Sequence, residues 1–145
     1  MLFAAGFGTR MGALTAERPK PLIEVAGRPL LDHALGIARG VAPTRIVANA
    51  HYRAGQIAAH LAGTEVRVSH EAEAILDTGG GLRAALPQLD ADPVFTLNTD
   101  AVWAGPNPLA LLAEVWYPAR MEALLLCVPP ARARRHAGAV DFAIG

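Results

Sequence analysis

The chain opens with Met1-Leu2-Phe3-Ala4-Ala5-Gly6-Phe7-Gly8-Thr9-Arg10, in which an apolar run ends at two closely spaced glycines. A short apolar run that stops at a glycine is typical of a buried strand, so we expect a strand over residues 1–5. Glycines directly after a strand let the backbone turn tightly and point its N–H groups at an anion. The stretch therefore predicts a buried strand and a loop suited to phosphate, although a tight turn without a ligand fits the same glycines.

In the rest of the chain, segments whose apolar residues have helical spacing alternate with segments that have the pattern of strands. Helices are predicted over 29–40, 55–61 and 81–86, the last ended by Pro87, and over 107–115 with Asn107 as the N-cap. Strands are predicted over 45–50, 65–69, 94–97 and 121–128. Helices that alternate with strands over short connections form crossover units. The sequence thus predicts an α/β, Rossmann-like three-layer fold with a mostly parallel sheet, as one domain over residues 1–145. The start of a further strand at 140–145 suggests that this fold is incomplete at its C-terminal end.

The composition indicates a globular chain without a strong net charge. Hydrophobic residues make up 52% of the chain and charged residues 18%, and thirteen basic residues balance thirteen acidic ones. Such a chain has no global field to attract nucleic acid or an anionic membrane, and no apolar run approaches the roughly 18 residues that a membrane span needs. The single cysteine, Cys127, lies in an apolar run, so we expect a buried thiol and no disulfide within the chain. These features predict a cytoplasmic protein that binds neither nucleic acid nor membrane, and they do not specify an oligomeric state.

Two basic residues follow the first strand at positions that favour anion binding. Arg10 places a forked, permanent cation at the end of the glycine loop, where it suits phosphate oxygens. Lys20 lies between Pro19 and Pro21, in a rigid extended segment that is an unusual setting for a solvated surface lysine. Exposed loops also contain Pro-Lys-Pro without any chemical role, so this segment does not decide the chemistry by itself.

Two further motifs stand where open α/β sheets bind ligands, beyond the carboxyl ends of strands. The glycine-rich run Asp77-Thr78-Gly79-Gly80-Gly81 leads into a predicted helix, and its bare backbone can approach a base or a sugar. A second motif, Asn98-Thr99-Asp100, closes a predicted strand with a carboxylate, which is a ligand that Mg²⁺ prefers. Taken alone, the glycines fit a flexible loop and the aspartate fits a strand-end cap. No histidine pair has metal-ligand spacing, and no serine elbow or Cys–His signature indicates covalent catalysis.

The ordered set of motifs closely resembles the signature of the sugar-1-phosphate nucleotidyltransferase family, and the matching residues are Ala4-Ala5-Gly6, Gly8-Thr9-Arg10-Met11, Pro19-Lys20-Pro21-Leu22 and Asn98-Thr99-Asp100. That resemblance implies a nucleotide-diphospho-sugar transferase fold, in agreement with the predicted α/β class. The run Thr78-Gly79-Gly80-Gly81 looks like the version found in uridylyltransferases that act on N-acetylmuramate-1-phosphate. The resemblance therefore implies that a nucleoside triphosphate, UTP in that subgroup, reacts with a sugar-1-phosphate and releases pyrophosphate, in bacterial cell-wall sugar recycling.

The resemblance also implies a role for each matching residue. Arg10 and Lys20 would be catalytic, Lys20 and Asp141 would contact the sugar phosphate, and Asp100 would bind Mg²⁺. The nucleotide would lie against Ala4, Ala5, Gly6, Gly8, Thr9, Arg10, Asn49, Asp77, Thr78, Gly79 and Gly80. Because the attacking phosphate oxygen is already anionic, positioning and neutralisation of charge would carry the reaction without a strong general base.

Two features depart from the family's pattern. Asp77 stands where the muramate subgroup has a glutamate, and the family's later segment, with a second metal-binding aspartate and part of the sugar pocket, is absent from these 145 residues. We therefore expect either a fragment of a longer enzyme or a naturally short protein. An inactive module that binds a sugar nucleotide is the main alternative to an enzyme. A dinucleotide-dependent oxidoreductase is disfavoured, because the strand that ends in Asn49-Ala50-His51 offers no acid to hold a ribose.

Overall fold

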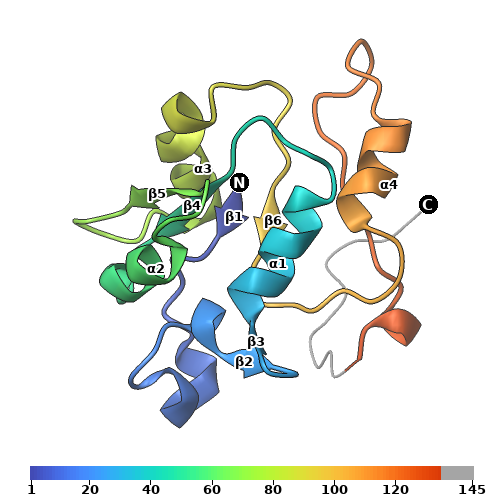
Figure 1. Cartoon of the computed structure of the whole chain (residues 1–145). Coiled ribbons are helices and arrows are strands. Elements are labelled where there is room, and N and C mark those ends of the chain that lie inside the picture. Colours follow the sequence, from blue (N-terminus) through green and yellow to red (C-terminus); the bar gives the residue numbers. More distant parts are fainter. Residues whose placement is uncertain (135–145) are drawn as a thin grey trace.

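A four-stranded parallel sheet forms the centre of the molecule in a computed structural model that describes residues 1–134 (Figure 1). The strands are β1 (Leu2–Phe3), β4 (Val47–Ala50), β5 (Arg67–His70) and β6 (Leu97–Asn98). Their order is β5-β4-β1-β6, and Leu2 of the central strand β1 lies opposite Ala48 on one side and Leu97 on the other. All neighbouring pairs in this sheet are parallel, which confirms the predicted α/β fold.

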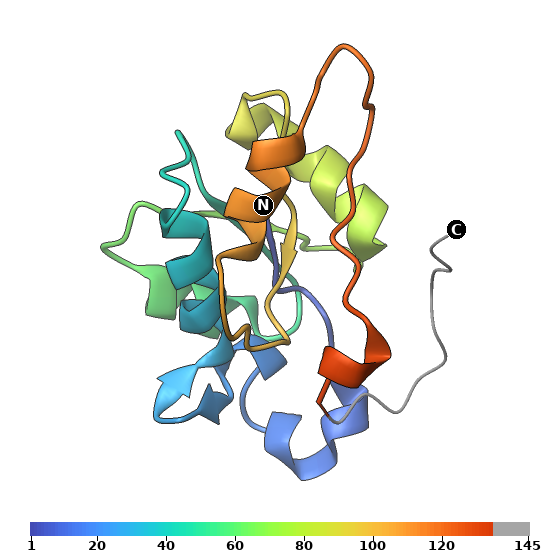
Figure 2. The ribbon, with the colours of Figure 1, turned by 90° about the vertical axis from the view of Figure 1, so that its right-hand side faces the viewer.

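Helices cover both faces of this sheet, as the side view in Figure 2 shows. One face carries α1 (Leu30–Arg39), α2 (Ala54–Leu61) and α4 (Pro108–Val115), and the other carries α3 (Asp77–Leu89). Successive strand residues point to opposite faces, so the side chains of one strand supply both cores. Ala48 and Ala50 pack with the first group of helices, whereas Val47 packs with Ala85 and Leu89 of α3. This arrangement is the predicted three-layer architecture.

Three short 3-10 helices and a small hairpin complete the described residues. The 3-10 helices are η1 (Thr9–Thr15), η2 (Lys20–Leu22) and η3 (Pro130–Arg132), and the hairpin pairs β2 (Glu24–Val25) antiparallel with β3 (Arg28–Pro29). Sequence patterns did not predict these elements, because an element of only two to seven residues is too short to show a periodic apolar pattern. Among residues 1–134, no helix has the length and apolar character that crossing a membrane requires.

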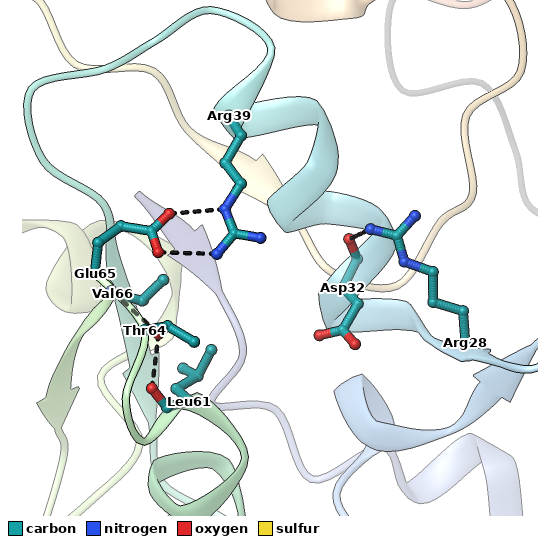
Figure 3. A network of polar contacts seen from close by, with 7 residues as sticks. All are labelled: Arg28, Asp32, Arg39, Leu61, Thr64, Glu65 and Val66. Atoms are coloured by element: carbon teal, nitrogen blue, oxygen red, sulfur yellow. Dashed lines mark hydrogen bonds and ion pairs between the residues drawn. The ribbon is translucent and has the colours of Figure 1, made fainter.

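A bidentate ion pair ties the end of α1 to the residues before β5 (Figure 3). Arg39 donates from Nε and Nη2 to the two carboxylate oxygens of Glu65, at 2.7 and 2.8 Å. The hydrogen bonds from Arg39 lower the pKa of Glu65 from its usual 4.5 to about 2. The pair is solvent-exposed, so it contributes to the alignment of two elements more than to stability.

The predicted strand over 121–128 is wrong. These residues form no strand in the described part of the chain, and Leu125 and Leu126 are 63% and 37% exposed. A strand forms only where a neighbour pairs with its backbone, and no strand within residues 1–134 pairs with this segment. The expectation of a buried thiol fails with it, because Cys127 is exposed.

The predicted bounds of the helix over 81–86 are also wrong. Helix α3 begins at Asp77, so the glycine-rich run forms its first turn, and it continues through Pro87 to Leu89. A proline near a helix end removes one hydrogen bond, but Leu89 is only 3% exposed and packs against Met1 and Val47. Burial of this leucine outweighs the lost bond.

Candidate functional site

A pocket of about 410 Å³ opens at the carboxyl ends of β1 and β6, the edge where parallel sheets bind ligands. It joins segments that lie far apart in the sequence. Its lining comprises residues 3–11 of β1 and the glycine loop, then Lys20, Pro21, Ile75, Asp77, Thr78, Asn98, Thr99 and Asp100.

Gly8 sets the shape of the glycine loop. Its φ of +64° lies in the left-handed region, and a Cβ atom there would lie 2.9 Å from Thr15 Cγ2 and 3.0 Å from Lys20 Cβ. Its carbonyl accepts hydrogen bonds from the Met11 amide at 2.8 Å and from Thr15 Oγ1 at 3.2 Å. A side chain at this position would push Lys20 away, so the glycine is what allows the loop and the lysine to meet.

Backbone N–H groups are available on two sides of the pocket. The amides of Gly6, Phe7 and Gly8 donate to no group within residues 1–134, and a Cβ built on Gly6 meets nothing within 4 Å. The cap residue of α3, Leu76, offers no side-chain acceptor to the amides of the first turn, and Asp77 and Thr78 of that turn line the pocket. Free amides after a strand and at a helix start are the elements of an anion site.

Lys20 and Asp100 meet inside this pocket. The Nζ atom of Lys20 donates to Asp100 Oδ2 at 2.9 Å, across 80 residues of sequence, and the two side chains are 26% and 48% exposed. Lys20 opens η2 directly after the buried Pro19. It is also the one lysine of the sequence, since the other twelve of the thirteen basic residues are arginines. An ion pair as exposed as this one adds little to folding stability, so its main effect is to hold both charges at the pocket.

A buried polar pair lies behind the glycine loop. Asn49, only 3% exposed, accepts from the Ala4 amide at 2.8 Å and donates to Glu71 Oε1 at 2.7 Å. Glu71, equally buried, also accepts from the Leu76 amide at 2.8 Å. A Cβ on Gly81 would lie 2.7 Å from both side chains, so only glycine lets α3 pack here. Asn49 and Glu71 therefore join the loop after β1 to the start of α3.

The structure brings most of the predicted site residues together. The following predicted residues line the pocket: Ala4, Ala5, Gly6, Gly8, Thr9, Arg10, Lys20, Asp77, Thr78 and Asp100. Asn49, Gly79 and Gly80 do not line it, and Asp141 lies outside the described residues. Glu71 was missed, because Glu71 and Glu73 look alike in sequence and only the fold shows which one is buried.

The oxygen donors of the pocket suit a divalent metal ion only together with a phosphate ligand. Within residues 1–134, no group of three His, Cys, Asp or Glu side chains is arranged to hold a metal ion. The pocket instead offers the carboxylates of Asp100 and Asp77 and the amide of Asn98. Mg²⁺ commonly takes one or two carboxylates and completes its shell with phosphate oxygens and water, so this set is sufficient only together with a phosphate ligand.

A family model and curated proteins that resemble this chain all point to nucleotide-transferring enzymes. The family described as "MobA-like NTP transferase domain" matches residues 1–138. The chain is 40% identical over 135 residues to the N-acetylmuramate alpha-1-phosphate uridylyltransferase of Caulobacter vibrioides, over 87% of this chain and 56% of that protein. It is 41% identical over 115 residues to the bifunctional protein GlmU of Burkholderia multivorans, over 79% of this chain and 24% of that protein.

Solved structures agree with the family match. The crystal structure of HddC from Yersinia pseudotuberculosis complexed with GMP-PN superposes with a TM-score of 0.58 at 25% identity, over 68% of this chain and 46% of that chain. The chain spans about half the length of the C. vibrioides relative. The family match includes the glycine loop, Lys20 and Asp100, and it covers nearly the whole sequence. This chain belongs to the family of MobA-like NTP transferase domains.

Proposed function

We propose that this chain carries the nucleotide site of an enzyme that transfers a uridylyl group from UTP to a sugar-1-phosphate, with N-acetylmuramate-1-phosphate as the preferred sugar, and releases pyrophosphate. One observation carries the proposal: Lys20, Asp100 and the uncommitted amides of the glycine loop converge on one pocket at the carboxyl edge of the sheet. This combination suits a polyphosphate and a divalent metal ion.

The proposed chemistry assigns each group a simple task. The amides of Gly6, Phe7 and Gly8 would donate to triphosphate oxygens, and Arg10 and Lys20 would neutralise their charge. A sugar-phosphate oxygen would attack the α-phosphorus while the bond to pyrophosphate breaks on the opposite side. Asp100 would hold Mg²⁺, which when bound supplies further neutralisation of phosphate charge. The nucleophile is already anionic, so no side chain has to remove a proton.

The choice of UTP and of the muramate sugar is supported by the C. vibrioides relative, whose name states uridylyl transfer and N-acetylmuramate alpha-1-phosphate. The first turn of α3 is the proposed base contact, since Asp77 and Thr78 line the pocket beside the glycine loop. Asp77 has a left-handed φ of +56°, which turns the backbone sharply where the pocket meets the helix. A cytoplasmic setting and a role in cell-wall sugar recycling go with this proposal.

The test is pyrophosphate release by the purified chain with Mg²⁺, each of the four nucleoside triphosphates, and either N-acetylmuramate-1-phosphate or glucose-1-phosphate. We expect release with UTP and the muramate sugar, and its loss in Lys20→Ala and Asp100→Asn. An exposed arginine remote from the pocket lining, Arg67, provides the matched control as Arg67→Ala, which should retain activity.

The alternative function, binding of a sugar nucleotide without turnover, predicts a different result. In that case UTP would raise the melting temperature of the protein, but no combination of substrates would release pyrophosphate. That outcome would exclude the transferase activity of this chain while leaving the nucleotide site in place.

A further inference from the structure

The turn between β4 and α2 and the first turn of α2 contact the segment that links Arg10 to Lys20. Three side chains, two from the turn and one from α2, donate to three consecutive backbone carbonyls. The Tyr52 hydroxyl donates to the carbonyl of Thr15 at 2.9 Å, the Arg53 guanidinium donates from Nη2 to that of Ala16, and Gln56 Nε2 donates to that of Glu17 at 2.9 Å. We call Tyr52, Arg53 and Gln56 the β4–α2 brace.

The members of the brace also support one another. Arg53 Nε donates to the Tyr52 hydroxyl at 3.0 Å, and the Arg53 guanidinium lies 5.4 Å from the centre of the Tyr52 ring. Arg53 has a left-handed φ of +50°, which is rare for a residue with a side chain. Strained conformations of this kind persist only where the surroundings fix them, and here the hydrogen bond to Ala16 is one of the contacts that do so.

The segment that the brace contacts, residues 9–17, has little other support. Its 3-10 helix η1 is broken at Gly12, where φ is +54° and ψ is −125°, and Ala13, Leu14, Ala16 and Glu17 are exposed. Thr15 is the buried exception, and its hydroxyl bonds only to Gly8 and Gly12 of the same loop. Arg10 lies at the start of this segment and Lys20 follows it by three residues. Movement of the segment would therefore move Arg10 and would displace the chain that leads to Lys20.

We propose that Tyr52, Arg53 and Gln56 are positioning residues, which fix residues 9–17 from outside the pocket and so hold Arg10 and Lys20 in place for a triphosphate. None of the three lines the pocket. This inference rests on the proposed function for the identity of the ligand, but the brace itself is a property of the ligand-free protein.

The test combines hydrogen–deuterium exchange with anion binding. Tyr52→Phe removes one hydroxyl and keeps the ring, and Gln56→Ala removes one donor. The sequence offers a matched control for each, because it contains only one other tyrosine and one other glutamine, Tyr117 and Gln88. The side chains of Tyr117 and Gln88 make no hydrogen bond within residues 1–134, so Tyr117→Phe and Gln88→Ala delete the same groups outside the brace.

We expect faster exchange in residues 9–19 of Tyr52→Phe and Gln56→Ala, with exchange in β4 and α3 unchanged. We also expect the dissociation constants for inorganic tripolyphosphate and for UTP with Mg²⁺ to rise about threefold to tenfold, as the loss of one hydrogen bond implies. The two control variants should match the wild type in both measurements.

Unchanged exchange in residues 9–19, or exchange that rises equally across the whole chain, would overturn the proposal. It would equally be overturned if the wild type bound no tripolyphosphate, or if the brace variants bound it as tightly as the wild type. Neither measurement needs turnover. If the transferase proposal is wrong and this one is right, pyrophosphate release will be absent while the brace variants still show faster exchange and weaker tripolyphosphate binding.

Discussion

Gly8 is the residue whose replacement tests the loop geometry most simply. Gly8→Ala must adopt a left-handed φ and must displace Thr15 or Lys20, whose atoms lie 2.9 and 3.0 Å from the added methyl group. We expect the free energy of unfolding to fall by about 1–3 kcal/mol in urea titrations. Gly6→Ala is the matched control in the same loop, because its added methyl group meets nothing within 4 Å and should change stability by less than about 0.5 kcal/mol. Equal stability of the two variants would contradict the described loop.

Lys20 should matter for turnover and not for folding. Its ion pair with Asp100 is partly exposed, so Lys20→Ala should change the free energy of unfolding by less than about 1 kcal/mol. If Lys20 meets charge that develops during the reaction, kcat should fall by at least about tenfold to a hundredfold. Steady-state pyrophosphate release and urea titration on the same preparation measure both quantities. Unchanged turnover would remove the catalytic role of Lys20.

At the residue scale, sequence patterns predicted the charged groups of the pocket but not the contacts that hold these groups, even where they named a participant such as Asn49. Lys20 is marked by two flanking prolines and Asp100 by its position after an apolar strand, so both stand out locally. Asn49 and Glu71 pair across 22 residues, and Tyr52 reaches Thr15 across 37. Such roles arise from tertiary contacts and have no local pattern that would reveal them.

At the scale of elements, the Asn49–Glu71 pair predicts a stability effect at the start of α3. Glu71→Ala leaves the buried Asn49 Nδ2 and the partly buried Leu76 amide without their acceptor. We expect a loss of about 1–3 kcal/mol in the free energy of unfolding. Glu73→Ala, at an exposed position of the same loop, should cost less than about 0.5 kcal/mol. If both variants unfold at the same urea concentration, Glu71 does not anchor this helix.

The pair that joins α1 to the residues before β5 predicts a pH dependence. The pKa of Glu65 is lowered in the folded protein to about 2, so its contribution is present above the usual value of 4.5 and is lost as the pH falls towards 2. NMR titration of the Glu65 carboxyl group should show a midpoint near 2, and Arg39→Gln should return that midpoint to near 4.5. Arg45→Gln, which removes a different exposed ion pair with Asp90, should leave the Glu65 titration unchanged. A Glu65 midpoint that is the same in Arg39→Gln as in the wild type would contradict the described geometry.

Sequence patterns predicted elements well where their burial is periodic. Helix α1 matches its apolar spacing closely, since the predicted range 29–40 contains Leu30–Arg39. The patterns failed where tertiary packing decides the outcome, as for Pro87 inside α3, or where a strand depends on a partner, as for 121–128. Apolar composition alone cannot distinguish a paired strand from an unpaired extended segment.

At the scale of the whole molecule, the predicted α/β architecture followed from the alternation of helices and strands, which permits few arrangements other than a parallel sheet. The position of the pocket followed in turn, because parallel strands bring their carboxyl ends to one edge. The order of the strands did not follow from any pattern in the sequence. It is this order, with β1 between β4 and β6, that brings the loops after residues 3, 50 and 98 together.

The central claim is that these distant segments form one triphosphate site at Lys20, and the single lysine of the sequence allows a direct test. Selective labelling of lysine with carbon-13 at Cε gives one side-chain NMR signal, which can be followed during titration with UTP and Mg²⁺, with inorganic tripolyphosphate and with uridine. The account predicts that UTP and tripolyphosphate shift the Lys20 signal, that uridine leaves it in place, and that Asp100→Asn shifts it in the absence of any ligand because the 2.9 Å ion pair is lost. A signal that stays fixed while calorimetry shows UTP binding would place the nucleotide elsewhere and contradict the account.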